Sequence, residues 1–509
     1  MLIQPEQNRK NTLNFSTDGC IIGSGAGGAI AAAKLAQQGI NILVIEEGPF
    51  VSRKNFDQNE NILLPKLYRW QGGLATDDLS IRILQGRSYG GSTTINWMAS
   101  LRTPDHVLNQ WVNEFGLEDY RPAQMMKYFD EIEKRIHVHD IKENEHNQQN
   151  RIILDGCAKL GIKAESVPNN SDGCIGCGGC GLGCAYDAKM DARLTYLNDA
   201  LEAGAAIFTG VRAETINYIS NNNQIINATL LGEEYGFDNR PVKIETQRTI
   251  VSGGAVFTPI LLQKSGLTKS KALGKFFQIH PVTLAIGFYD RIIDPSYGIP
   301  LTSQCDEYSN LDGNGYGFWL EIPPMQIGML GVNAPAYGLR RSETIRNQRK
   351  LGVLLVLVRD GANKKSNGSV EWKRGRPHIT YKLSEPDKKH MMLGLEKALE
   401  VHFAAGAKQV YTMHSEQIDI FNASDIPKIR HLKNGPNQLS LFSAHPQGTA
   451  RMGSDPKISV VDKTLEMHYY PGIYIMDGSV HPTALGVNPM ETIYAVVSRG
   501  IDLSQNLGL

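Results

Sequence analysis

The sequence predicts an α/β fold in which a parallel sheet with flanking helices is joined to a second domain, built on an antiparallel β-sheet flanked by helices. A strand, a glycine turn, a helix and a second strand follow one another near the amino terminus, and αβ segments recur in the middle and at the end of the chain. Between residues 301 and 383 the pattern changes to short β runs with hairpin signals such as Asn367-Gly368. These two patterns predict the two kinds of sheet.

The amino-terminal segment is a βαβ unit. An apolar strand over 20–22 precedes an Ala-rich helix over 29–38, and a second run, 40–45, is apolar on both faces, as in a buried parallel strand. Between the first strand and the helix, three glycines form G-x-G-x-x-G, which in this context is a dinucleotide-binding fingerprint. They are Gly23, Gly25 and Gly28. The unit therefore predicts a Rossmann-like domain whose helix amino terminus faces a pyrophosphate.

An acidic residue follows the glycine turn at the expected distance. Glu46 ends the second strand, about twenty positions on, where a carboxylate binds the ribose hydroxyls of a dinucleotide. Glu47 is the weaker candidate because it begins the turn at Gly48-Pro49. The glycine loop by itself does not distinguish NAD from FAD.

The end of the chain repeats the pattern. A strand over 472–477 precedes a helix over 489–503, and a further αβ segment spans 196–214. The helix start fits a capping arrangement, with Asn488 as N-cap, Pro489 at N1 and Glu491 at N3.

Two further segments lie outside the dinucleotide-binding pattern. Ser384 and Pro386 predict the start of a helix over 385–405 whose apolar positions recur about one turn apart. The polar stretch 139–150 is interpreted as an exposed loop.

Composition and charge favour a small-molecule enzyme. Of 509 residues, 41% are apolar and 20% charged, with 52 Lys plus Arg against 52 Asp plus Glu. This balance provides no field that would attract nucleic acid or an acidic membrane. The amino terminus lacks the apolar core of a signal peptide, and the longest apolar stretch, near 351–358, is too short to span a bilayer. We therefore expect a cytoplasmic protein without nucleic-acid partner or transmembrane segment.

Four of the seven cysteines form a C-x2-C-x2-C-x3-C run: Cys174, Cys177, Cys180 and Cys184. This spacing is typical of bacterial ferredoxins and predicts an iron-sulfur cluster. Ala185 stands where ferredoxins carry proline, so zinc and a structural knot without metal remain alternatives. The isolated Cys20, Cys157 and Cys305 are expected to be small buried hydrophobic residues.

At several separated places the sequence resembles the glucose-methanol-choline (GMC) oxidoreductases, a family of FAD-dependent alcohol oxidases and dehydrogenases. The resembling stretches follow the family order and cover most of the chain. They are GSGAGG from Gly23, VIEEGP from Val44, GRSYGGSTTINWM from Gly86, GAVFTPILLQKSG from Gly254, HPQGTARMG from His445 and DGSVHPTALGVNPMETI from Asp477. Residues 290–439 carry no such motif, as expected of a variable substrate pocket.

The resemblance implies an FAD site. It assigns Gly90, Gly91, Ser92 and Asn96 to the flavin and Asp477 to its ribityl chain. Some members carry a histidine near the position of Asn96 that binds the flavin covalently. Residues 93–96 of this chain contain none, so we expect non-covalent FAD.

The resemblance also implies a catalytic pair. His445 corresponds to the family's catalytic histidine, and Asn488 to its partner, which is asparagine in the sterol and long-chain alcohol oxidases. Our hypothesis is that His445 accepts the hydroxyl proton of an alcohol while hydride passes to flavin N5 and the Asn488 amide fixes the oxygen. The alternatives are a lyase or isomerase of the same fold, and an electron-transfer flavoprotein subunit without an alcohol site.

The cysteine run also has counterparts in the family. It resembles a stretch of the long-chain fatty alcohol oxidases, and its AKMDA ending resembles that of bacterial sugar dehydrogenases, whose run holds an iron-sulfur cluster. A cluster near the flavin would pass electrons to an acceptor protein or a quinone. We expect residues 15–105, 185–285 and 440–509 to form a discontinuous FAD-binding domain. Residues 106–184 and 286–439 would bind the substrate and include the Cys-rich insert 172–186.

Overall fold

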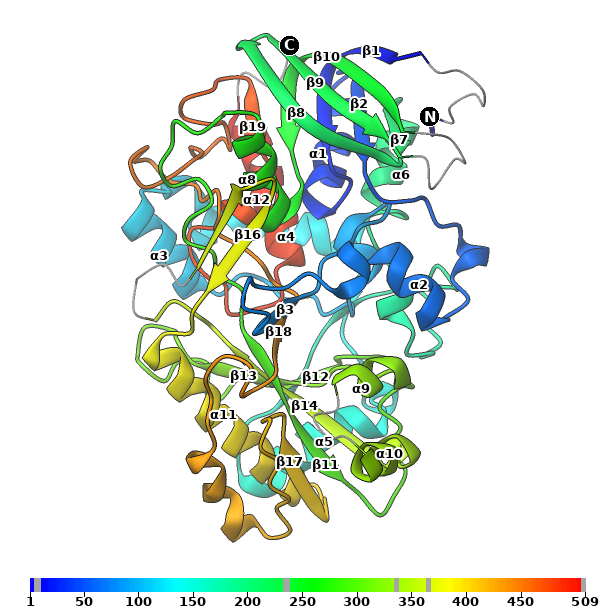
Figure 1. The fold of residues 1–509 in the computed structure, drawn as a ribbon, viewed down its shortest axis with the longest axis vertical. Helices are drawn as coiled ribbons and strands as arrows, with labels where there is room; N and C mark the ends of the chain where they lie inside the picture. Colours follow the sequence, from blue (N-terminus) through cyan, green and yellow to red (C-terminus); the bar gives the residue numbers. More distant parts are fainter. Residues whose placement is uncertain (4–10, 232–238, 334–337, 363–367, 505–509) are drawn as a thin grey trace.

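The computed structural model describes residues 1–3, 11–231, 239–333, 338–362 and 368–504. Two sheets lie toward opposite ends of its long axis, with helices against both (Figure 1). The helices are α1 (Ala26–Gln37), α2 (Glu60–Leu67), α3 (Asp105–Phe115), α4 (Pro122–Arg135), α5 (Gln148–Leu160), α6 (Tyr196–Glu202), α8 (Gly254–Lys264), α9 (Ile327–Asn333), α10 (Gly338–Arg346), α11 (Glu385–Ala404) and α12 (Met490–Leu503).

The first sheet has the order β7-β2-β1-β10-β9-β8, with β19 also paired to β10. Strands β7, β2, β1, β10 and β19 run parallel, whereas β9 and β8 extend the sheet antiparallel. Helices α6 and α12 pack against α1. The strands are β1 (Leu13–Ile22), β2 (Ile42–Glu46), β7 (Ala206–Thr209), β8 (Val211–Ser220), β9 (Asn223–Leu230), β10 (Arg240–Val251) and β19 (Ile473–Ile475).

The second sheet has the order β3-β18-β11-β14-β13-β12-β5, with β17 also paired to β11. Its pairs are antiparallel except β3 with β18. Helix α11 packs against β14 and β11, and α5 packs against α11. The strands are β3 (Ile81–Ile83), β5 (Glu165–Ser166), β11 (Val282–Phe288), β12 (Ser303–Cys305), β13 (Phe318–Glu321), β14 (Leu351–Val358), β17 (Gln409–Thr412) and β18 (Leu441–Ser443).

Two small strand pairs complete the fold: β4 (Val138–His139) with β6 (Asn169–Asn170), and β15 (Gly368–Lys373) with β16 (Arg376–Tyr381). The hairpin signal Asn367-Gly368 is not the turn of this pair. Gly368 begins β15, while Asn367 lies outside the described residues. The chain reverses at Arg374 and Gly375, whose φ angles of +51° and +76° suit a tight hairpin.

The helix expected over 385–405 is present as α11, and Ser384 caps it by accepting a hydrogen bond from the Asp387 amide. The exposed loop predicted over 139–150 is too long at its end, because Asn147 caps α5 and that helix begins at Gln148. Gln149 and Asn150 are buried although polar. Their side-chain amides donate to backbone carbonyls of Val353 and Ile299.

In the described part of the chain, no helix combines the length and the apolar character that crossing a membrane requires.

Candidate active site

A cavity of about 610 Å³ lies where the carboxyl ends of the first sheet's parallel strands meet the second sheet. Ligands bind at this edge of open α/β sheets because helix amino termini and loops converge there. Of the residues predicted to bind the cofactor or to act in catalysis, Gly28 and Gly90 do not line the cavity. Those that do are Gly23, Gly25, Glu46, Gly91, Ser92, Asn96, His445, Asp477 and Asn488.

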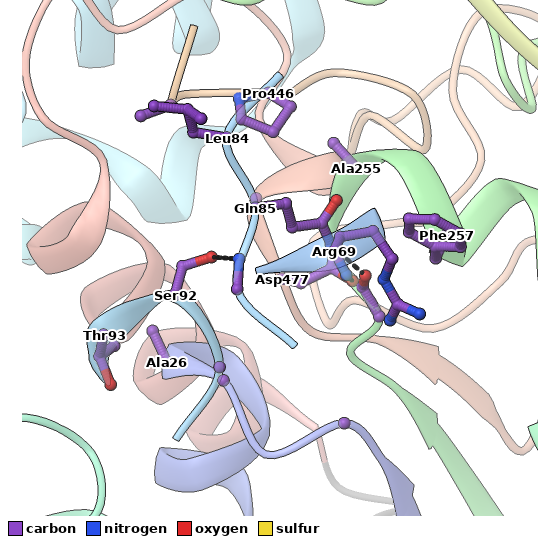
Figure 2. A pocket seen from close by; sticks show the side chains of 18 of the residues that line it. Ala26, Arg69, Leu84, Gln85, Ser92, Thr93, Ala255, Phe257, Pro446 and Asp477 are labelled. Atoms are coloured by element: carbon purple, nitrogen blue, oxygen red, sulfur yellow. Dashed lines mark hydrogen bonds between the residues drawn. The ribbon is translucent and has the colours of Figure 1, made fainter. Parts of the chain in front are cut away.

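The glycine turn leaves no room for side chains. A Cβ on Gly23, whose φ is +106°, would lie 2.3 Å from the Ser252 carbonyl oxygen at the end of β10. A Cβ on Gly28 would lie 2.0 Å from the Gly23 carbonyl oxygen, so this glycine lets α1 approach the turn. A Cβ on Gly91, whose φ is +56°, would lie 2.6 Å from the Gly25 Cα. Figure 2 shows Ser92 and Thr93 beside Ala26 of α1, on the side of the cavity away from Arg69 and Phe257.

Glu46 organises this end of the cavity. One carboxylate oxygen accepts from the Ser24 amide at 2.9 Å and the Ser24 hydroxyl at 2.8 Å, and the other accepts from the Gly48 amide at 2.7 Å. Burial raises the pKa of Glu46, which these hydrogen bonds oppose. Glu47 instead forms ion pairs with Arg69 and Arg87.

Asp477 holds the amino terminus of α8 beside the cavity. Its carboxylate accepts from the Gly254 amide at 2.8 Å, the Thr258 hydroxyl at 2.5 Å and the Ser479 amide at 2.8 Å. It also lines the cavity (Figure 2).

Several buried acceptor atoms around the cavity have no hydrogen-bond partner among the described residues: Gln85 Oε1, Asn96 Oδ1 and Asn488 Oδ1. A buried acceptor without a partner is costly, so such atoms mark places where a ligand supplies donors. Together with the glycine turn and Glu46, they fit a bound flavin dinucleotide.

Where the cavity borders the second sheet, its wall contains both polar and apolar residues. Its polar members are His445, Asn488 and Glu321, and its apolar members include Val282, Leu301, Leu355, Leu357 and Phe442. The imidazole Nε2 of His445 lies 3.4 Å from the Asn488 amide nitrogen. Burial lowers the pKa of His445 to about 4, so this imidazole is neutral at pH 7.

Asn488 does not cap α12 as predicted. Pro489, with helical backbone angles, takes the N-cap position, and no side chain caps the helix. The Asn488 side chain instead lies at the cavity and donates a hydrogen bond to the Glu321 carboxylate.

Glu321 is a functional candidate that the sequence analysis missed. Only 2% of its surface is exposed, and burial raises its pKa to about 7, which the Asn488 hydrogen bond opposes. A carboxylate within the apolar stretch Phe318–Ile322 was a signal for it, because an unpaired acid is rarely buried without a function.

The cysteine run packs against this site. Cys174, Cys177, Cys180 and Cys184 line one small second cavity together with Lys189. The Lys189 ammonium donates to the carbonyl oxygens of Cys180, Thr94 and Asn96 at 2.9, 2.6 and 3.1 Å. Residues 94–96 line or adjoin the large cavity, so one buried lysine connects the cysteine loop with the predicted flavin loop.

The metal prediction is not supported for a single ion. Within the described ranges, no three side chains of His, Cys, Asp or Glu are grouped closely enough to hold one. The iron-sulfur cluster predicted at these four cysteines is therefore not supported by the described part of the structure.

Comparisons with known proteins identify the family. Sequence models of the GMC oxidoreductases match residues 64–282 and 364–496, and a model of NAD(P)-binding Rossmann-like domains matches residues 21–60. The long-chain-alcohol oxidase FAO4B of Arabidopsis thaliana is 32% identical over 97% of this chain and 69% of its own length. This chain belongs to the GMC oxidoreductase family. It is accordingly an FAD-dependent oxidoreductase that acts on CH-OH donors.

Other GMC proteins agree with this assignment. The long-chain-alcohol oxidase FAO4A of Arabidopsis thaliana is 32% identical over 95% of this chain and 68% of its own length. Among solved structures, pyridoxine 4-oxidase from Mesorbium loti has a TM-score of 0.70 at 16% identity, over 96% of this chain and 99% of that one. At this identity the structural likeness shows the fold alone.

Proposed function

We propose that this GMC oxidoreductase oxidises a primary alcohol with a long aliphatic chain to the aldehyde, with non-covalent FAD in the large cavity. The observation that carries the proposal is the meeting of the His445 and Asn488 side chains at 3.4 Å, at the end of an apolar wall. A polar pair suits a hydroxyl group, and the apolar wall suits the alkyl chain behind it. The names of the plant relatives support the same substrate class.

The residues of the first sheet would hold the cofactor. Gly23 and Gly25 would face the pyrophosphate at the amino terminus of α1, and Glu46 the ribose. Gly91, Ser92 and Asn96 would border the flavin, with Gly90 shaping that loop, and Asp477 would bind the ribityl chain. When bound, FAD supplies the hydride acceptor. Acid precipitation of the protein should leave the pellet colourless and the supernatant yellow, whereas a yellow pellet contradicts non-covalent binding.

The protein must also remove one proton. As the C-H bond breaks with its electron pair transferred as hydride, the O-H bond breaks and the proton passes to a base, leaving a C=O double bond. Two groups that line the cavity have the chemistry to accept this proton: His445, as the sequence predicts, and Glu321.

We further propose that Cys174, Cys177, Cys180 and Cys184 hold an iron-sulfur cluster from which electrons pass to an acceptor protein or a quinone. The contact of Lys189 with both the cysteine loop and the flavin loop supports this route. Protein purified anaerobically should contain iron and acid-labile sulfide, and Cys177→Ser should lower both. Absence of both elements from the intact protein would refute the cluster.

The cytoplasmic location and the domain boundaries given above stay predictions.

Anaerobic reduction of the flavin tests the main proposal. Linear primary alcohols of increasing length should bleach the flavin absorbance, with the rate constant rising as the chain lengthens. His445→Ala should slow bleaching by about 100-fold or more while the oxidised flavin spectrum remains. If no alcohol, sterol or sugar reduces the flavin of the wild-type protein, the result contradicts an alcohol-oxidising function. It then favours the non-redox lyase or isomerase.

A further inference from the structure

Two cysteines outside the cysteine run are neighbours in the core of the second sheet. Cys157 belongs to α5 and Cys305 ends β12, and both side chains are completely buried. Both are free cysteines, and their thiols are in hydrogen-bond contact. Their burial is as predicted, but the sequence does not show the contact, because the two residues are far apart in the chain.

The contact follows from the way in which α5 packs against β12 (Figure 1). Near the start of the helix, the Asn150 side chain accepts from the Thr302 amide at 2.9 Å, and the Ser303 hydroxyl donates to the Asn150 carbonyl oxygen at 2.9 Å. Cys157 follows Asn150 by about two helical turns, and Cys305 is the second residue after Ser303 in the strand. Each cysteine therefore lies on the same face as the residue that anchors its element.

The two thiols differ in their hydrogen bonds. The Cys157 thiol donates to the Cys305 sulfur, and the backbone amide of Glu307 donates to the same sulfur. These two hydrogen bonds lower the pKa of Cys305, which its burial opposes. The pKa of Cys157 is raised, because its proton is held in the hydrogen bond and its thiol is buried. Since the thiolate is the nucleophilic form of cysteine, Cys305 is the reactive member of the pair.

The surroundings of the pair select a small oxidant. Neither side chain reaches the surface, so a bulky disulfide reagent cannot approach the sulfurs in the folded protein. Glu307, whose amide contacts the Cys305 sulfur, is exposed, so this sulfur lies close beneath the surface. Hydrogen peroxide is small and uncharged, and it suits such a place.

We infer that Cys157 and Cys305 form a reversible disulfide that links α5 to β12, with hydrogen peroxide as the oxidant. The Cys305 thiolate attacks one peroxide oxygen, the O-O bond breaks, and a sulfenic acid forms while the departing hydroxide takes up the thiol proton as water. The Cys157 sulfur then displaces the hydroxyl group from Cys305, which leaves with the Cys157 proton as a second water. The two thiols are oxidised, and peroxide is reduced to water. The inference does not depend on the proposed alcohol oxidation.

Peptide mapping of the holoenzyme tests the inference directly. The wild-type protein is reduced with a phosphine, freed of the reductant and treated with hydrogen peroxide, and the remaining thiols are alkylated in denaturant before proteolysis. We expect one cross-linked pair of peptides that contains Cys157 and Cys305 and separates on reduction. Cys20 in β1 is the control, since it is equally buried and burial raises its pKa, so it should stay a free thiol. If Cys157 and Cys305 are both recovered as free thiols, the inference is wrong.

Serine variants test the order of the two steps. In Cys157→Ser the hydroxyl can still donate to Cys305, but no thiol is present to displace the sulfenic acid, so dimedone should label Cys305 after peroxide treatment. In Cys305→Ser, Cys157 should stay a thiol. Labelling of Cys157 in place of Cys305 would overturn the assignment of the nucleophile. Where a variant fails to fold, the wild-type map decides, because a sulfinic acid at Cys305 beside a free Cys157 would exclude the disulfide.

Discussion

Lys189 donates a hydrogen bond to the Cys180 carbonyl oxygen at 2.9 Å, although the lysine side chain is almost entirely buried. Burial lowers the pKa of this ammonium, which Cys180 and Asp191 oppose. The same group donates to Thr94 and Asn96, so three carbonyl oxygens from two loops depend on one side chain.

Lys189→Met should destabilise the protein by about 3 kcal/mol, because three buried carbonyl oxygens lose their donor. This loss of stability should appear as a lower denaturation midpoint and as weaker retention of FAD on gel filtration. Lys163→Met is the matched control, since the Lys163 side chain is 59% exposed and pairs with Glu165 at the surface. Equal midpoints for the two variants would contradict a linking role for Lys189.

Gly91→Ala should abolish FAD binding. Its Cβ would lie 2.6 Å from the Gly25 Cα, at a backbone φ of +56°. Gly39→Ala is the control that separates backbone strain from steric crowding. Gly39 also has a positive φ, +83°, but no atom lies within 4 Å of an added Cβ. The Gly39 variant should lose only about 1 kcal/mol of stability and keep its flavin absorbance. Loss of flavin from both variants would assign the effect to the backbone alone.

Glu46→Gln should weaken FAD binding and lower stability by about 1 to 3 kcal/mol. Glutamine offers one acceptor oxygen where the carboxylate uses two, so its NH2 group must face the amide of either Ser24 or Gly48. Glu47→Gln is the comparison, since Glu47 forms ion pairs and makes none of these loop contacts. FAD titration should give a larger dissociation constant for Glu46→Gln than for Glu47→Gln, and the reverse order would contradict the ribose assignment.

The pH dependence of kcat/KM should identify the base. Burial raises the pKa of Glu321 to about 7, with Asn488 as its hydrogen-bond donor, so the carboxylate predominates only above that pH. Activity should therefore fall as pH decreases through about 7. If His445 were the base, the fall would occur near pH 4, since burial lowers its pKa to about 4. In Glu321→Gln the limb near pH 7 should disappear, and turnover should drop by about 100-fold.

Sequence patterns predict the parts of this protein whose chemistry is local. The glycine turn at Gly23, the carboxylate of Glu46 at the end of β2 and the capped helix beginning after Ser384 each depend on neighbours within a few positions. The α/β fold and the second, mostly antiparallel sheet are confirmed on the same basis. The capping prediction at Asn488 failed because the side chain has partners far away in sequence, Glu321 and His445.

By itself, then, the sequence determined the Rossmann-like unit, the family resemblance and the set of candidate residues in its motifs. Only the tertiary structure decided which groups surround His445. Glu321 reaches the cavity because β13 pairs with β14, and His280 contacts His445 because Gly486 and Asp360 hold the His280 ring and backbone in place. Neither residue belongs to a motif, since pairing between strands and hydrogen bonds across distant loops leave no pattern in the local sequence. The backbone amide of Gly486 donates to His280 although the two residues lie 206 positions apart in the sequence.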